Sequence, residues 1–278
     1  MRAGRDLEGT LERTSSVSDF LADPFGRYYL GRRHCVFARS PTLIGFASWG
    51  RPDTDDVSEL LHLCEIGLRP GMPHRFLVDV RGLELVLPST FGLFVTYTRK
   101  HREVLKQNIV RQAQLRPEGL VGAIISGFSQ VARLSYPERV FGDVEEALAW
   151  LQVEPQEGVE LVSELEAIRS DACESSAVVG RLREELNASG AVAIERAARQ
   201  LGLSTRSLQR ALRQAGTTYR IELNSFRIRR AQELLRDGAQ DLSWISAEVG
   251  FSSAQHFATA YRRAVGVTPS AWRARNRA

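Results

Sequence analysis

The chain has 278 residues and a mass of 31.0 kDa, enough for two domains, and its 43% hydrophobic and 25% charged residues are ordinary for a globular protein. No apolar run reaches the roughly 18 residues that a transmembrane helix needs, and the N-terminus lacks the apolar core of a signal peptide. The three cysteines, Cys35, Cys64 and Cys173, are too widely spaced for a disulfide framework or a metal site. We therefore expect a cytoplasmic protein with no bound metal or cofactor and no membrane partner.

The formal net charge of +4 conceals a difference between the two parts of the chain. Residues 181–278 contain 17 Arg, no Lys and 8 acidic residues, a net charge of +9, whereas residues 1–180 have a net charge of −5. A strongly basic region is typical of a surface that contacts phosphate groups. Basic helix faces are often only solvated, so this indication depends on the motifs found in the same region.

The first part of the chain predicts a flexible arm over residues 1–25, either disordered or lying along the protein surface, followed by an α/β domain over residues 26–153. Charged residues, Ser and Thr dominate the arm. In the domain, apolar stretches of strand length alternate with segments of helical periodicity, which predicts a mixed sheet with covering helices. We expect strands at 29–38, 43–49, 75–80, 120–125 and 139–141, and helices at 53–66, 88–115, 128–134 and 144–151.

The order of these elements, ending with strand 139–141 and helix 144–151, resembles the STAS-type fold of anti-sigma-factor antagonists. In that family a strand and a loop precede a phosphorylatable Ser at a helix start, and here residues 78–83 precede Ser89. The resemblance implies that Ser89 is a possible phosphorylation site, although Pro88 stands where the family has an aspartate. Alternatively, Ser89 only caps the helix.

This part of the chain contains none of the catalytic, phosphate-binding or metal-binding motifs considered below. Residues 67–71 form a Gly-containing turn without the helix and Lys of a phosphate loop, and no Ser lies in a nucleophile elbow. The histidines are scattered without metal-ligand spacing. We expect no catalytic residues, and the distant cysteines argue against a DNA-repair enzyme with a metal-bound Cys cluster.

Residues 154–178 predict a helical linker with one apolar stripe. Val159, Leu161, Val162, Leu165 and Ile168 recur at helical spacing. One helix cannot bury such a stripe alone, so it packs either on its own domain or on the same helix of a second copy, which would make a homodimer.

Residues 179–278 predict an all-α domain in which a long helix, 219–235, joins two helix-turn-helix motifs. In the first motif Gly202 makes the turn and Ser204 caps a helix at 205–214. In the second, Gly250 makes the turn before a helix at 252–263, and Trp244 and Trp272 are expected in the core.

The C-terminal signature comprises Val249-Gly250-Phe251, Phe257, Tyr261-Arg262-Arg263, Gly266 and Thr268-Pro269, followed by Trp272-Arg273. It resembles that of AraC/XylS-type transcription regulators, over roughly the last third of the chain. The resemblance implies base contacts at Arg206, Gln209 and Arg210, and the matching positions of the second motif are Gln255, His256 and Thr259. Phosphate contacts are expected at Ser204, Arg213, Ser252, Arg262 and Arg263.

Together these features predict a sequence-specific regulator that binds double-stranded DNA through two successive major grooves. The N-terminal domain would then serve regulation, dimerisation or the binding of a protein partner or small-molecule effector. In the alternative interpretation, a STAS-like domain docks another regulator and the basic domain only tethers it to DNA.

Overall fold

The computed structural model describes residues 10–237 and 240–276, apart from the side chains of residues 129, 130 and 237. The chain divides into two compact units, Met1–Asp171 and Ala172–Ala278. None of the helices within the described ranges combines the length and apolarity needed to cross a lipid bilayer.

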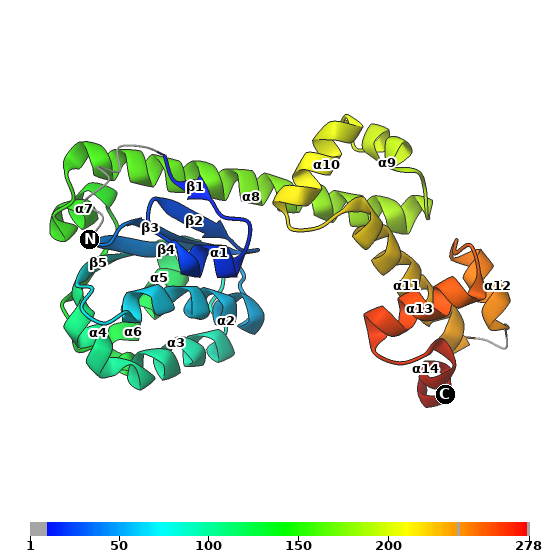
Figure 1. Cartoon of the computed structure of the whole chain (residues 1–278), viewed down its shortest axis with the longest axis horizontal. Coiled ribbons are helices and arrows are strands. Elements are labelled where there is room, and N and C mark those ends of the chain that lie inside the picture. Colours follow the sequence, from blue (N-terminus) through cyan, green and yellow to red (C-terminus); the bar gives the residue numbers. More distant parts are fainter. Residues whose placement is uncertain (1–9, 238–239, 277–278) are drawn as a thin grey trace. The chain divides into compact units, whose positions relative to one another are not determined.

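The first unit is built on a mixed seven-stranded sheet whose strands lie side by side in sequence order (Figure 1). The pairs β2–β3 and β3–β4 are antiparallel, whereas β1–β2 and all pairs from β4 to β7 are parallel. The strands are β1 (Glu12–Arg13), β2 (Arg27–Leu30), β3 (His34–Ser40), β4 (Leu43–Gly50), β5 (His74–Leu83), β6 (Ile109–Leu115) and β7 (Glu138–Phe141).

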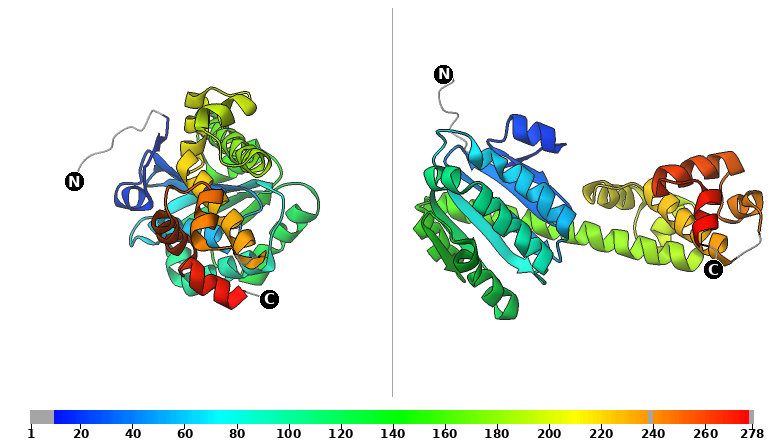
Figure 2. Two further views of the ribbon diagram at one scale, coloured as in Figure 1. Left: turned by 90° about the vertical axis from the view of Figure 1, so that its right-hand side faces the viewer. Right: turned by 90° about the horizontal axis from the view of Figure 1, so that it is seen from below.

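Helices cover both faces of this sheet, because alternate residues of its central strands are apolar on both sides. On β3, Val36 and Ala38 join a core with helices α2 and α3, which lie side by side in Figure 2. The buried Cys35 and Phe37 point to the opposite face, which is covered by α7 and the first half of α8 (Figure 1). The helices of this unit are α1 (Val17–Ala22), α2 (Thr54–Leu63), α3 (Pro88–Lys100), α4 (Arg102–Asn108), α5 (Gly119–Ser126), α6 (Phe128–Ala132) and α7 (Val144–Leu151), with a 3-10 helix η1 (Cys64–Leu68) after α2.

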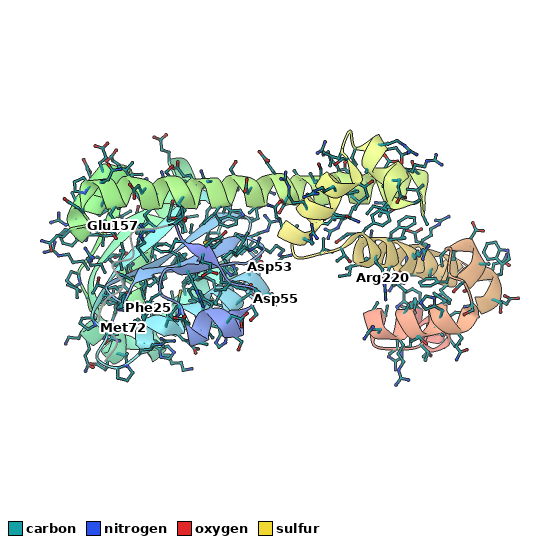
Figure 3. All side chains as sticks on the ribbon, turned by 45° about the horizontal axis from the view of Figure 1, so that its top comes forward. Phe25, Asp53, Asp55, Met72, Glu157 and Arg220 are labelled. Carbon is teal, nitrogen blue, oxygen red and sulfur yellow. The ribbon has the colours of Figure 1, made fainter. Side chains whose placement is uncertain are left out.

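Local hydrogen bonds explain where α2 begins. The Asp53 carboxylate accepts from the backbone N–H groups of Asp55 and Asp56, and the Asp56 carboxylate accepts from the backbone N–H of Asp53 (Figure 3). This reciprocal capping box satisfies N–H groups that have no partner inside the helix. Arg32 bonds to both carboxylates and joins the cap to the β2–β3 turn.

The structure corrects three predicted elements of this unit. The predicted strand 29–38 is an antiparallel hairpin, because β2 and β3 pair on either side of a turn at residues 31–33. The predicted helix 88–115 is two helices, α3 and α4, divided at His101, and residues 109–115 form strand β6 between β5 and β7. The predicted buried strand 120–125 is helix α5, in which Leu120 is 78% exposed.

Of the two alternatives for the N-terminal arm, disorder is wrong for its described part, which packs on the first unit. Residues 1–9 lie outside the described range, but residues 10–25 contain β1 and α1. The Phe20 side chain is fully buried in the core beneath α2, and Ser16 caps α1 by accepting from the N–H of Asp19. One buried aromatic residue and one cap order a segment whose composition is polar.

Helix α8 (Pro155–Ser189) is a single helix of 35 residues and therefore extends beyond the predicted linker. Leu161, Leu165 and Ile168 are buried within the first unit, and Arg39 on β3 forms ion pairs with two glutamates of α8. The apolar stripe thus packs on its own domain, the first of the two expected alternatives. Val159 is the exception, since it is 56% exposed.

The second unit contains two hydrophobic clusters that share helix α11. The first cluster combines the second half of α8 with α9, α10 and the start of α11, through residues such as Leu182, Leu208 and Phe226. The second combines the end of α11 with α12, α13 and α14, around the fully buried Phe257 and Tyr261. The helices are α9 (Ile194–Gln200), α10 (Thr205–Gln214), α11 (Tyr219–Asp237), α12 (Leu242–Glu248), α13 (Ala254–Val265) and α14 (Pro269–Asn276).

Candidate nucleic-acid interface

The first helix-turn-helix motif consists of α9 and α10. Gly202 has a φ of +69° between them, in the left-handed region that glycine adopts without steric cost. The Ser204 hydroxyl caps α10 by accepting from the Ser207 N–H at 3.0 Å. Leu208 and Leu212 are buried against α9 and α8. The opposite face of α10 is exposed and carries Arg206, Gln209, Arg210 and Arg213.

The second motif, α12 and α13, has the same organisation. Gly250 has a φ of +84° in the turn, and Gly266 has a φ of +81° at the end of α13. The capping residue of α13 is Ser253, whose hydroxyl accepts from the His256 N–H at 3.1 Å. With Phe257 and Tyr261 buried on one face, the other face exposes Gln255, His256, Thr259, Arg262 and Arg263.

All eleven residues predicted to contact DNA are therefore exposed, on or immediately before α10 and α13. Within the described part of the chain, none of the five arginines among them forms an ion pair, so their guanidinium groups remain available to anions or base edges. The hydroxyls are partly engaged. Ser204 bonds within its cap, and Thr259 donates to the Gln255 carbonyl at 3.0 Å. Ser252 lies outside α13, with its hydroxyl 3.4 Å from Nδ1 of His256.

A surface groove between α11 and α13 adds residues that the sequence did not predict as part of this surface. Arg220 and Asn224 of α11, and Thr218 just before it, line the groove together with His256 and other residues of α13. Figure 3 shows Arg220 near the start of α11. The sequence did contain an indication of this face, because Arg220 and Asn224 are four residues apart and so lie on one side of a helix.

Several aromatic and arginine side chains stabilise the second motif. Trp272 packs in the core with its ring 6.5 Å from that of Tyr261, as predicted, but Trp244 is 43% exposed and the prediction of a core position is wrong. The guanidinium of Arg227 lies 5.4 Å from the Phe251 ring, and partial burial lowers its pKa. Arg227 therefore stabilises the turn that follows α12.

The polar residues singled out in the first unit do not form a second site of this kind. Ser89 is exposed in the first turn of α3, but the capping residue is Leu87, so the expectation that Ser89 caps the helix is wrong. Cys35 and Cys64 are buried, and Cys173 is exposed. The described residues contain no group of three His, Cys, Asp or Glu side chains placed to hold a metal ion.

The exposed helices and their supporting core coincide with a known domain. Residues 197–275 match the model of a family described as "Helix-turn-helix domain", and the signature from Val249 to Arg273 lies within this range. Residues 197–275 are a helix-turn-helix domain of the AraC type. The AraC-type domain thus includes α10 and α13 and all eleven predicted contact residues.

Curated proteins are similar to this chain over segments of comparable length. The chain is 35% identical over 86 residues to the HTH-type transcriptional activator RhaR of Klebsiella pneumoniae, which is 31% of each protein. It is 39% identical over 80 residues to the ornithine utilization regulator of Pseudomonas aeruginosa, which is 29% of this chain and 24% of that protein. The match thus spans less than a third of each relative.

A solved structure of a Chromobacterium violaceum transcriptional regulator of the AraC-type group is also similar, with 27% identity and a TM-score of 0.35. It covers 37% of this chain and 96% of that one.

Proposed function

We propose that the protein is a sequence-specific DNA-binding transcription regulator that places α10 and α13 in two successive major grooves. One observation carries this proposal: the AraC-type domain has two capped helices of similar length, and each exposes a polar, basic face opposite a buried one. An α-helix fits the major groove of B-DNA, where each base pair presents a distinct pattern of donors and acceptors. The curated relatives named above, described as a transcriptional activator and a utilization regulator, support the same function.

The chemistry of the two faces assigns the contacts. Arg206 and Arg210 can each bond to O6 and N7 of guanine through two N–H groups, and Gln209 can pair with adenine. On α13, Gln255, His256 and Thr259 take the matching positions. Arg213, Arg262 and Arg263 would bind phosphates, with Ser204 and Ser252 placed to donate to the backbone next to each helix start.

Helix α11 supplies the spacing between the two modules. Its 19 residues correspond to ~28 Å, and residues of both hydrophobic clusters lie along it. Successive turns of the major groove are ~34 Å apart, a separation that the helix reaches once the width of the modules is added.

Selection of a binding site tests the proposal directly. The purified full-length chain would be incubated with random duplex DNA at moderate salt and the bound fraction sequenced. We expect enrichment of a bipartite site whose two halves are about 10 bp apart. Recovery of the input distribution, with no preference over competitor, would refute sequence-specific reading.

The first unit is proposed to regulate DNA binding, through dimerisation, a small-molecule effector or a protein partner. Its strands β4 to β7 are parallel and separated by helices, which supports the STAS-like resemblance. Ser89 is exposed within the first turn of a 13-residue helix, where N–H groups and the helix dipole favour a phosphate.

These features also favour the second candidate, a partner-controlled protein that is only tethered to DNA. A tether predicts equal affinity for all duplex sequences and a partner whose binding changes in Ser89→Asp. The site-selection experiment separates the two candidates, because only the regulator enriches a motif.

A further inference from the structure

The first unit contains a partly open cavity of about 140 Å³ between the sheet and the helices on one of its faces. Phe46 and Val78 form its floor, and Leu60, Phe94 and Ile125 contribute from α2, α3 and α5. Almost all of its surface is apolar. For comparison, an engineered cavity of roughly 150 Å³ lined by Leu, Ile and Phe in another protein stays dry and binds benzene. The space in this protein therefore accommodates one aromatic ring.

Three side chains on the cavity wall, His34, His74 and Tyr97, have polar atoms without a hydrogen-bond partner among the described residues, and His74 and Tyr97 lie near η1. The Nε2 atom of His74 and the hydroxyl of Tyr97 are buried and have no hydrogen-bond partner among the described residues. Both border the 3-10 helix η1: a Cβ on Gly67 would lie 3.2 Å from the His74 ring, and Tyr97 packs against the core cluster that contains Cys64 and Ile66 of η1. The two groups thus belong to the same end of the cavity. Buried polar groups are normally paired, so each requires an explanation.

The protonation states of these groups define what they can bind. Nδ1 of His74 is 2.9 Å from the Met72 carbonyl, which can only accept, so Nδ1 carries the hydrogen. Burial lowers the pKa of His74, so the ring is neutral at pH 7 and Nε2 is an acceptor. Burial raises the pKa of Tyr97, so its hydroxyl keeps its proton and can donate. One acceptor and one donor at the end of an apolar cavity complement a single hydroxyl group.

We propose that this cavity is a binding site for a small single-ring phenol. Its ring lies among Phe46, Leu60, Phe94 and Ile125, and its hydroxyl donates to Nε2 of His74 and accepts from the hydroxyl of Tyr97. Charged ligands are disfavoured, because the wall is apolar and holds no unpaired charge at this end. Both ring nitrogens of the buried His34 also lack a hydrogen-bond partner, but Nε2 faces the Glu59 carboxylate at 3.4 Å, outside the cavity wall, so His34 is not part of the proposed hydroxyl pair.

Calorimetric titration of the full-length protein with phenol and toluene tests the proposed hydrogen bonds to His74 and Tyr97. The two molecules are similar in size, but only phenol has a hydroxyl group. We expect phenol to bind more tightly than toluene. Tyr97→Phe should weaken phenol binding about fivefold to tenfold and leave toluene binding unchanged. The matched control is Tyr29→Phe, which removes a hydroxyl that is bonded to Glu59 and lies outside the cavity. A purely structural role of Tyr97 would move the binding of both ligands alike.

A second experiment tests whether the ligands bind inside this cavity. Ile125→Trp fills the cavity from α5 and should abolish the binding of both ligands, with folding checked by circular dichroism. If this variant does not fold, crystals soaked in 4-bromophenol decide, because bromine gives an anomalous peak that we expect between β5 and α3. Three results would overturn the proposal: no binding of phenol at millimolar concentration, unchanged phenol binding in Tyr97→Phe, or a bromine peak elsewhere with only water beside His74. None of these measurements involves DNA, so the outcome is independent of the proposed regulatory function.

Discussion

Arg206 and Arg262 are both exposed arginines without an ion pair in the described part of the chain, yet they should contribute to DNA binding in different ways. Arg206 lies in the first turn of α10, where it can reach a base edge. Replacing it by Ala should cost about 1–3 kcal/mol on the selected site and relax the preference at one base pair. Replacing Arg262 by Ala should weaken binding to all sequences alike and reduce the salt slope by about one.

Fluorescence anisotropy at several salt concentrations, on the selected site and on single-base variants of it, separates these effects. Arg181→Ala serves as the control, because it removes the same charge from an exposed position of α8. If Arg206→Ala and Arg181→Ala bind the selected site equally well, Arg206 does not read a base.

Glu222 on α11 is a buried carboxylate whose charge is held by two donors. Nε of Arg183 and the Thr217 hydroxyl both donate to it at 2.7 Å. Burial alone raises the pKa of Glu222, but these hydrogen bonds outweigh burial and hold it below the ordinary value of 4.5. A lowered pKa stabilises the fold above pH 4.5, and this contribution disappears as the pH falls through the folded-state value.

We therefore predict that Glu222→Gln reduces the free energy of unfolding at pH 7 by about 1–2 kcal/mol. The effect is limited because the Arg183 side chain is 54% exposed. The difference from wild type should shrink as the pH falls below about 4.5 and through the lowered pKa of Glu222, as followed by urea denaturation. Glu233→Gln, in an exposed pair with Arg230, should show almost no difference at any pH.

At the scale of single elements, α8 contains two glycines with different surroundings. A Cβ at Gly180 would meet nothing within 4 Å, whereas a Cβ at Gly158 would lie 2.7 Å from Leu148, which is buried. Gly180→Ala should stabilise the protein by about 0.5–1 kcal/mol, because alanine loses less backbone entropy in a helix. Gly158→Ala gains the same propensity but displaces Leu148, so it should be the less stable of the two in thermal unfolding. The opposite order would show that this part of α8 does not pack against α7 as described.

Helices and strands were predicted correctly where several local sequence signals agreed, and incorrectly where the apolar pattern was interrupted or short. The bounds of α10 agree with the predicted 205–214, because a capping Ser, a Gly turn and one apolar stripe all indicate the same helix. Strand β6 was missed because Gln112 and Gln114 are buried polar residues that interrupt the apolar alternation expected of a strand. The short apolar run 120–125 is equally compatible with a strand and a helix, and only the structure identifies it as a helix.

At the scale of the whole molecule, the exposed faces of α10 and α13 were predictable and the cavity was not. A helix face is defined by residues within one turn of each other, so the exposed residues of each helix could be identified from spacing, and the family resemblance then indicated which of them contact bases. The cavity is lined by residues mainly from several strands and helices of the first unit, which are up to 102 residues apart, between His34 and Tyr136. The unpaired groups near η1, on His74 and Tyr97, become recognisable only when all their neighbours are known.

The shared helix α11 leads to a prediction about the DNA site as a whole. Tyr219, Leu223 and Phe226 near its start pack in the first cluster, and Ile228, Ala231 and Leu235 pack in the second. The two modules are therefore held by one continuous helix and not by a flexible segment. Inserting 5 bp between the two halves of the selected site turns one half to the opposite face of the DNA. One module should then no longer contribute to the binding affinity.

Inserting 10 bp is the more informative change, because it restores the face but moves the halves apart by a further ~34 Å. A flexible linker would recover much of the affinity, whereas a rigid α11 cannot span the added distance. We predict that both insertions reduce the affinity to that of a single half-site, measured by competition against a duplex in which the second half is scrambled. Recovery of near-original affinity with 10 bp would mean that α11 unfolds or bends on DNA, and the two modules would then have to be regarded as independent readers.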